Sequence, residues 1–292
     1  MKTLILFIRS LRIHQWLKNF FIFAPVIFSL NFFHWPYLKN SLIAFGLFSL
    51  VTGSIYIFND CFDRKYDKLH PEKSKRPIAS GALSLPVALA GASILLLVAL
   101  AAISYFHRGF FVAALFYVGL NLAYSSYFKK IVIFDVMIIG VGFVLRVQIG
   151  GVINKIVLSP WILIITFLIA MLLGLIKRRQ ELIKVTENSN GPETRQNLRK
   201  YNLALLDQLI SISTSTTLIS YIIYVLNPGI QEKFHTNYLY LTIPFVAFGI
   251  FRYLYLTYSR GMGENPAEII FSDIPFTVNI LLWVMVFVLL IQ

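Results

Sequence analysis

The feature that most constrains this chain is a series of apolar segments, each about 20 residues long, that runs along its whole length. A helix rises about 1.5 Å per residue, so each segment is long enough to cross the hydrocarbon core of a bilayer. With 13% charged residues, the chain has too few polar side chains to cover the surface of soluble domains. We predict nine membrane-spanning helices, at residues 15–33, 40–60, 85–106, 110–128, 132–153, 160–177, 204–226, 238–258 and 270–291. The expected fold is an all-α membrane bundle that forms a single domain over residues 1–292.

The basic residues are distributed unequally between the two sides of this bundle. If alternate loops lie on opposite sides, one side carries 21 Lys and Arg residues and the other carries 4. Cytoplasmic loops of membrane proteins carry the excess of Lys and Arg. We therefore expect a multi-pass protein of the cell (inner) membrane with its N-terminus and its basic loops in the cytoplasm. The net charge of +13 follows from this arrangement and from contact with anionic lipids, so it does not call for a nucleic acid partner.

Neither a cleaved signal peptide nor a cysteine-based cross-link is expected in this chain. The N-terminal region has basic residues but no small-residue cleavage site after a short apolar core, so we expect the first helix to be retained. Cys61 is the one cysteine, which excludes an intrachain disulfide and argues against a Cys-based metal site.

Acidic side chains gather where the second predicted helix reaches the cytoplasm. Asp60, Asp63 and Asp67 fall at positions i, i+3 and i+7, so on a continuing helix the three carboxylates share one face, and Asn59 flanks them. Crowded carboxylates repel each other unless a cation neutralises them, and oxygen ligands of this kind suit Mg²⁺ together with substrate phosphates. We predict that Asn59, Asp60, Asp63 and Asp67 hold Mg²⁺ and a diphosphate.

An ordinary helix end is the alternative interpretation of this acidic face. In that case the carboxylates are solvated and pair with Arg64, Lys65 or Lys68 on the same segment. The basic residues that follow, Lys73, Lys75 and Arg76, favour the diphosphate site. Carboxylates for a metal followed by cations for phosphate oxygens are typical of such a site.

A second polar run, Lys177-Arg178-Arg179-Gln180-Glu181, follows the sixth predicted helix. Lys177, Glu181 and Lys184 share a helical face, which makes this run a candidate substrate contact. The alternative is that these cations only anchor the helix end at the membrane surface. We place the active site in two loops, at about residues 60–84 and 177–203.

Polar residues of the fourth and fifth predicted helices form a third candidate group. Tyr124, Lys129 and Lys130 lie at the end of the fourth helix, together with Asn121 and Ser125, and Asp135 and Arg146 lie within the fifth. Charges inside a membrane span normally face a cavity or a partner, so Arg146 is a candidate substrate contact. The alternative is that Asp135 and Arg146 each pair with another helix for structural reasons. The five histidines have no metal-ligand spacing, and we assign them no role.

The pattern Asn-Asp-x-x-Asp-x-x-x-Asp at 59–67, after the second of nine helices, resembles the first Asp-rich motif of the UbiA superfamily of intramembrane prenyltransferases. The helix plan extends this resemblance over the whole chain. Prenyltransferases of that superfamily carry a second motif of the type Asp-x-x-x-Asp after the sixth helix. Here the corresponding residues are Lys177 and Glu181, so a cation replaces one metal-binding acid.

In this departure the sequence resembles one branch of the superfamily, the decaprenyl-phosphate phosphoribosyltransferases. These are also called 5-phosphoribosyl-1-phosphate polyprenol synthases of arabinan precursor biosynthesis. The blocks that carry the resemblance are Leu11-Arg12-x-x-Gln15-Trp16-x-Lys18-Asn19, Arg76-Pro77-Ile78-Ala79-Ser80-Gly81, Tyr124-Ser125, Leu145-Arg146 with Gly150-Gly151, Lys177-Arg178 with Glu181, and Arg252-Tyr253. In that branch the lipid brings a monophosphate and is the acceptor, and phosphoribosyl diphosphate is the soluble donor. The resemblance leaves room for a homo-oligomer.

The resemblance implies a Mg²⁺-dependent phosphoribosyl transfer to a polyprenyl phosphate. We expect Asp60, Asp63 and Lys177 to be catalytic, with the carboxylates holding the metal on the leaving diphosphate. The expected substrate contacts are Asn59, Lys18, Arg12, Lys73, Lys75, Arg76, Tyr124, Lys129, Lys130, Arg146, Arg178 and Glu181. The alternatives are an ordinary UbiA-type prenyltransferase with an aromatic or glycerol-phosphate acceptor, and a lipid-binding or transport protein without catalytic activity.

Overall fold

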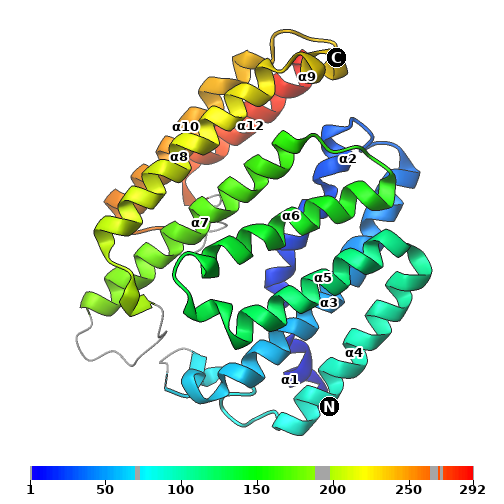
Figure 1. The fold of residues 1–292 in the computed structure, drawn as a ribbon, viewed down its shortest axis with the longest axis vertical. Helices are drawn as coiled ribbons and strands as arrows, with labels where there is room; N and C mark the ends of the chain where they lie inside the picture. Colours follow the sequence, from blue (N-terminus) through cyan, green and yellow to red (C-terminus); the bar gives the residue numbers. More distant parts are fainter. Residues whose placement is uncertain (1, 70–72, 188–197, 264–268, 270–271, 292) are drawn as a thin grey trace. The chain divides into compact units, whose positions relative to one another are not determined.

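The computed structural model describes residues 2–69, 73–187, 198–263, 269 and 272–291, and these contain helices and no β-strand (Figure 1). They form two compact units that divide at residues 158 and 159. The predicted all-α class is confirmed. The predicted loops 60–84 and 177–203 lie partly outside the described residues, at 70–72 and 188–197.

Among the described residues, seven helical segments are long and apolar enough to cross a membrane. They are Trp35–Asp67, Leu85–Phe106, Arg108–Ser126, Phe134–Asn154, Pro160–Thr186, Leu203–Leu226 and Leu239–Arg260. They correspond to the second through eighth predicted spans, so the multi-pass membrane character is confirmed and the count of nine is not. The last predicted span contains a shorter apolar helix, α12 (Ile274–Leu290).

The first predicted span is the one that departs most from a regular α-helix. α1 (Lys2–Ser10) is followed by an 11-residue 3₁₀ segment, η1 (Ile13–Phe23), and by the five-residue α2 (Ala24–Phe28). Arg12, between α1 and η1, has a left-handed backbone with φ 52°, which ends the first helix. Pro25 stands in the first turn of α2, where its missing N–H is tolerated. The predicted span 15–33 is therefore a 3₁₀ segment followed by a short α-helix that ends at Phe28, and not one continuous α-helix.

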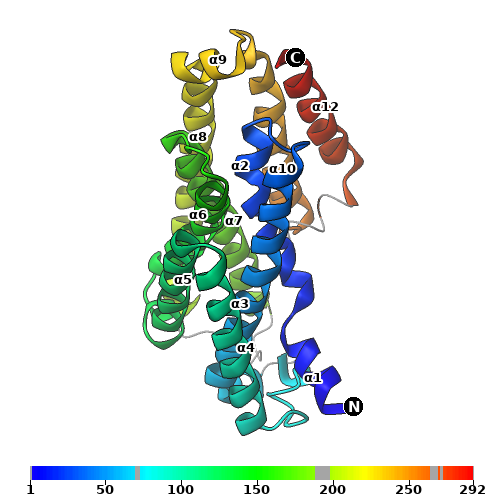
Figure 2. The same ribbon diagram turned by 90° about the vertical axis from the view of Figure 1, so that its right-hand side faces the viewer.

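The first unit is built around α3 (Trp35–Asp67), which packs against α4 (Leu85–Phe106), α5 (Arg108–Ser126) and α6 (Phe134–Asn154). Two short 3₁₀ turns, η2 (Lys73–Lys75) and η3 (Phe128–Lys130), follow α3 and α5. The segment η1 runs against α3 and α6, as both views show (Figures 1 and 2). The core between these helices includes Ile22, Phe48, Ile55, Phe110 and Ile149.

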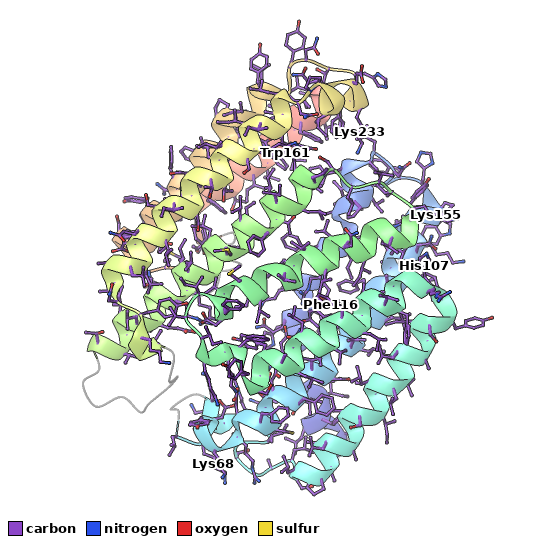
Figure 3. The ribbon with its side chains drawn as sticks, in the orientation of Figure 1. Lys68, His107, Phe116, Lys155, Trp161 and Lys233 are labelled. Atoms are coloured by element: carbon purple, nitrogen blue, oxygen red, sulfur yellow. The ribbon has the colours of Figure 1, made fainter. Side chains whose placement is uncertain are left out.

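The helix ends of this unit alternate as the charge pattern predicts. Lys68, at the end of α3, lies at one end of the unit, whereas His107 and Lys155 lie at the other (Figure 3). His107 joins α4 to α5 and its Nδ1 accepts a hydrogen bond from the backbone N–H of Phe110, which caps the first turn of α5. Lys155 ends α6 in a left-handed conformation.

The second unit pairs α7 (Pro160–Glu187) with α8 (Leu203–Leu226), and α10 (Ile243–Arg260) with α12. The short turn η4 (Leu198–Lys200) precedes α8, and α9 (Pro228–Phe234) and η5 (Leu239–Thr242) join α8 to α10. Trp161 at the start of α7 and Lys233 on α9 lie at the same end of this unit (Figure 3). The opposite end of α7 carries the second predicted motif.

Candidate active site

A cluster of three carboxylates lies at the end of α3, as the i, i+3, i+7 spacing predicts. Asp60 and Asp67 are buried, with 3% and 5% of their surface exposed. Arg76 joins the two: its Nη1 lies 3.1 Å from Oδ1 of Asp60 and 2.6 Å from Oδ2 of Asp67. Burying charge without a partner is costly, and the shared guanidinium offsets that cost for both carboxylates. The basic run after α3 therefore folds back onto the acids that precede it.

Asp60 has a second cationic partner, Arg12, whose Nη2 contacts the same Oδ1 atom. Arg12 reaches it because the left-handed turn after α1 directs the chain along α3, where Leu11 packs on Gly53. Burial lowers the pKa of the Arg12 guanidinium, and the charge of Asp60 opposes this shift. The guanidinium also lies over the ring of Tyr56, 5.4 Å from its centroid.

The third carboxylate is held from α5 and η3. Lys129 forms an ion pair with Asp63, and one helical turn earlier Ser125 donates a hydrogen bond to the side-chain oxygen of Asn59. The two contacts match because Asn59 and Asp63 are four residues apart on α3, as are Ser125 and Lys129. Ser125 lies in the third candidate group but was not among the expected substrate contacts. The signal that points to Ser125 is its spacing of four residues from Lys129, which equals the spacing of Asn59 from Asp63.

The cluster is balanced in charge, because three acids meet three basic side chains. Asp60, Asp63 and Asp67 are paired with Arg12, Arg76 and Lys129. Each ion pair engages one of the two oxygens of its carboxylate. Within the described part of the chain, no three His, Cys, Asp or Glu side chains come close enough to form a metal cage.

The donor atoms at this site nevertheless fit Mg²⁺. Carboxylate and amide oxygens are hard ligands, and Mg²⁺ commonly takes only one or two carboxylates and completes its shell with water and phosphate oxygens. A metal bound here would therefore share the carboxylates with Arg12, Arg76 and Lys129, or release those cations toward the phosphates of a ligand.

The other predicted contacts of this unit lie around the cluster. Lys73 and Lys75 lie in η2, directly before Arg76. Lys18 is exposed on η1, Tyr124 is half-buried on α5, and Lys130 is exposed next to Lys129. Arg146 lies elsewhere, inside the helix core and 4% exposed, where it donates to Asn19, Tyr117 and the carbonyl of Gly142. The structure therefore groups Arg12, Arg76 and Lys129 with the carboxylates and separates Arg146 from them.

The second predicted motif lies on α7 of the other unit. Arg178 is 3% exposed and its Nη1 lies 2.7 Å from Oε2 of Glu181. Lys177, the neighbouring residue, is exposed. Glu181 is thus engaged by a cation of its own helix, so this stretch of α7 is not a free acidic cluster.

Sequence reasoning missed a further polar group beside this motif. Nε of Arg179 lies 2.6 Å from Oδ1 of Asp207, which also accepts a 2.7 Å hydrogen bond from the hydroxyl of Tyr258. The side-chain amide of Gln180 donates to the backbone carbonyl of Thr257 at 3.0 Å. These contacts tie α7 to α8 and α10, and their partners are too distant in sequence to be recognised from spacing.

Comparison with known proteins identifies the family. The sequence profile described as the UbiA prenyltransferase family matches residues 20–271. The chain belongs to the UbiA family. As a UbiA protein it is a transferase of the membrane.

Individual relatives are similar over most of the UbiA chain. A Corynebacterium glutamicum protein named decaprenyl-phosphate phosphoribosyltransferase is 29% identical over 288 residues, covering 95% of this chain and 84% of the relative. The uncharacterized protein y4nM of Sinorhizobium fredii is 28% identical over 267 residues, covering 90% of this chain, which spans about half (52%) of the length of y4nM.

A solved structure shares the fold of this UbiA chain. The UbiA homolog from Archaeoglobus fulgidus, bound to GPP and Mg²⁺, superposes with a TM-score of 0.69 over 96% of this chain and 97% of its own, at 19% identity. The predicted UbiA-like fold is therefore confirmed.

Proposed function

We propose that this protein transfers 5-phosphoribose from phosphoribosyl diphosphate to a polyprenyl phosphate and releases diphosphate. The observation that carries the proposal is the loss of the second acidic cluster. UbiA prenyltransferases resemble one another in having two Asp-rich motifs. At the position of the second motif this chain has Lys177, and its Glu181 is held by Arg178. A single carboxylate cluster then remains to hold one diphosphate. The relative from Corynebacterium glutamicum, named for phosphoribosyl transfer, supports the same assignment.

The carboxylate cluster suits the diphosphate of a sugar donor. Asp60, Asp63 and Asp67, with Asn59, would hold Mg²⁺, which stabilises the negative charge that develops on the leaving diphosphate. Arg12, Arg76 and Lys129 already lie on these carboxylates. When a metal takes the carboxylate oxygens, the same three cations are in place to bind phosphate oxygens of the donor.

The reaction needs no strong general base. An oxygen of the lipid phosphate, already anionic near neutral pH, attacks the anomeric carbon of the ribose. The bond from that carbon to the diphosphate oxygen breaks, and the electron pair leaves with the diphosphate. The transition state resembles an oxocarbenium ion, as in glycosyl transfer generally.

The cations outside the cluster are assigned to the remaining phosphates. Lys73 and Lys75, in the turn η2 that directly precedes Arg76, are assigned to the 5-phosphate of the ribose or to the diphosphate. Lys177 and Arg178, or the exposed Lys18, are assigned to the lipid phosphate because a monophosphate acceptor requires cations and no further acids. Tyr124 and Lys130 are further contacts from α5 and η3.

The deciding experiment offers both donor types to the purified protein in detergent with Mg²⁺. We expect radiolabelled phosphoribose to move from its diphosphate to a polyprenyl phosphate. We expect Asp60→Asn and Asp63→Asn to reduce that transfer at least 100-fold, with folding checked by gel filtration. Product formed only from a prenyl diphosphate and an aromatic acid would contradict the proposal and identify an ordinary prenyltransferase. Binding without turnover of either donor, unaffected by these substitutions, would point to a lipid-binding or transport protein.

A further inference from the structure

We propose that Arg146 is a positioning residue that fixes the N-terminal arm of the active site through Asn19. The arm is defined as residues 11–23, which carry Arg12 at one end and Asn19 near the other. The inference rests on the proposed function, because it concerns how Arg12 is held against Asp60 in that site.

The donors of Arg146 are directed at neutral groups of the protein. Nε donates to the side-chain oxygen of Asn19 at 2.9 Å, Nη1 to the carbonyl of Gly142 at 2.5 Å, and Nη2 to the hydroxyl of Tyr117 at 3.1 Å. Its guanidinium carbon also lies 5.1 to 5.6 Å from the ring centroids of Phe48, Tyr117 and Phe143. A buried guanidinium satisfied in this way orients its neighbours and does not face a substrate.

Asn19 converts that contact into a link between three segments. Its oxygen accepts from Arg146 on α6, while its Nδ2 donates to Oγ of Ser49 at 2.9 Å and to Oγ1 of Thr52 at 3.1 Å, both on α3. Asn19 is 1% exposed, so these contacts exclude water. One amide therefore joins η1 to α3 and α6 at the same point.

The arm depends on such links because its own backbone gives it little rigidity. A 3₁₀ helix rarely exceeds four residues, since its hydrogen bonds are poorly aligned, yet η1 has 11 residues. Its other fixed points are glycines that allow close approach. A Cβ at Gly150 would lie 2.0 Å from the carbonyl oxygen of Ile22, and a Cβ at Gly53 would lie 3.4 Å from Cβ of Leu11.

The position of Arg12 follows from these three fixed points. Leu11 sets one end of the arm on α3, and Asn19 and Ile22 set the other on α3 and α6. Removing the guanidinium of Arg146 takes away the α6 side of the middle link and leaves the buried oxygen of Asn19 without this donor, so we expect Arg12 to lose its fixed distance from Asp60. A misplacement of about 1 Å at a reacting centre is enough to lower turnover on the order of 100-fold.

A disulfide across the arm tests this directly. In a Cys61→Ala background, Leu11→Cys with Gly53→Cys places two Cβ atoms at about the separation of a natural disulfide. We expect rapid cross-linking when Arg146 is present, and cross-linking at least tenfold slower with Arg146→Met. Once formed, the disulfide should raise phosphoribosyl transfer by the Arg146→Met protein at least tenfold. Reduction with dithiothreitol should reverse this increase.

Matched variants separate positioning from general stability. His107→Ala removes a helix cap at the far end of the same unit, and we expect it to lower thermal stability without slowing the cross-link. If Arg146→Met does not fold, Ser49→Ala and Thr52→Ala cut the same link on the α3 side and should also slow it.

The outcomes distinguish this inference from the proposed function. Equal cross-linking rates with and without Arg146, or a locked Arg146→Met protein that gains no activity while the wild type is active, would overturn the positioning role. Slowed cross-linking in a protein that transfers no phosphoribose would support the link between Arg146 and the arm, and would place the failure in the proposed function.

Discussion

Nη1 of Arg76 lies 2.6 Å from Oδ2 of Asp67, and the same nitrogen lies 3.1 Å from Asp60. Nine residues separate Arg76 from Asp67, so the chain after α3 must reverse direction to bring the cation onto the acidic face. One arginine thus bridges two buried carboxylates that would otherwise repel each other across one helical face.

Arg76→Gln is expected to destabilise the protein and to weaken substrate binding together. Asp60 keeps Arg12, whereas Asp67 loses its ion pair with Arg76, and leaving a buried carboxylate without this partner costs about 1–3 kcal/mol. Thermal unfolding in detergent measures this, with Lys68→Gln as the exposed control on the same segment. An equal melting temperature for both variants would contradict the bridging role of Arg76.

Lys129 and its neighbour Lys130 are expected to respond differently to the same substitution. Lys129 pairs with Asp63, while Lys130 is exposed. The Lys129–Asp63 pair is partly solvated, so Lys129→Gln should change stability by less than about 1 kcal/mol. Its effect on activity should be larger, at least tenfold in kcat/KM for phosphoribosyl diphosphate and larger than that of Lys130→Gln. Equal kinetic losses would show that only the total charge of η3 matters.

Removal of divalent metal is expected to abolish transfer while leaving the fold intact. The carboxylates are already neutralised by Arg12, Arg76 and Lys129, so folding does not depend on a metal to balance their charge. Activity with chelator and after addition of Mg²⁺, compared with melting temperature under both conditions, measures the two effects separately. A large fall in melting temperature on chelation would show that the metal also has a structural role.

Gly150→Ala is expected to destabilise the protein strongly, and Gly119→Ala is expected to be neutral or stabilising. A Cβ at Gly150 would lie 2.0 Å from the carbonyl oxygen of Ile22, which is backbone and cannot rotate away. Overpacking of this kind costs about 1–3 kcal/mol or more. Gly119, within α5, has open space around its Cβ position, so alanine there should gain up to about 1 kcal/mol of helix propensity. Melting temperatures that do not separate the two variants would contradict the close approach of η1 to α6.

Glycine is expected to be tolerated better at residue 133 than at residue 131. Ile133 has φ 72°, a conformation that strains a β-branched residue, whereas Ile131 has φ −98°. Both side chains are half-buried, so Ile→Gly removes a similar contact at each site. Relief of backbone strain should make Ile133→Gly about 1–2 kcal/mol less destabilising than Ile131→Gly. Chemical or thermal unfolding of the two variants measures the difference.

The apolar pattern of the sequence predicted most of the long helices of this molecule. Of the nine predicted spans, seven are helices of membrane length among the described residues, because a helix in a bilayer must satisfy its own backbone hydrogen bonds within the segment. The patterns failed in the predicted span 15–33, where η1, a 3₁₀ segment that contacts α3 and α6, is followed by the short helix α2. Hydropathy does not report such contacts.

The acidic face was predictable for the same reason, since Asp60, Asp63 and Asp67 share one side of a single helix. Three of the basic residues expected around it, Arg12, Arg76 and Lys129, contact these carboxylates, but their pairing was not predicted. Local partners such as Arg64 were considered for the carboxylates, whereas the structure pairs them with Arg12, Arg76 and Lys129.

The sequence by itself thus determined the membrane-spanning pattern, the UbiA-type motif and the shared face of the carboxylates. Only the tertiary structure decided which cation meets which acid, and that Arg146 contacts Asn19 across 127 residues of chain. The physical reason is one of range. Helix periodicity and hydropathy act over a few turns, whereas the Asp60–Arg12 and Asp63–Lys129 pairs join residues 48 and 66 positions apart, which meet only when the helices pack.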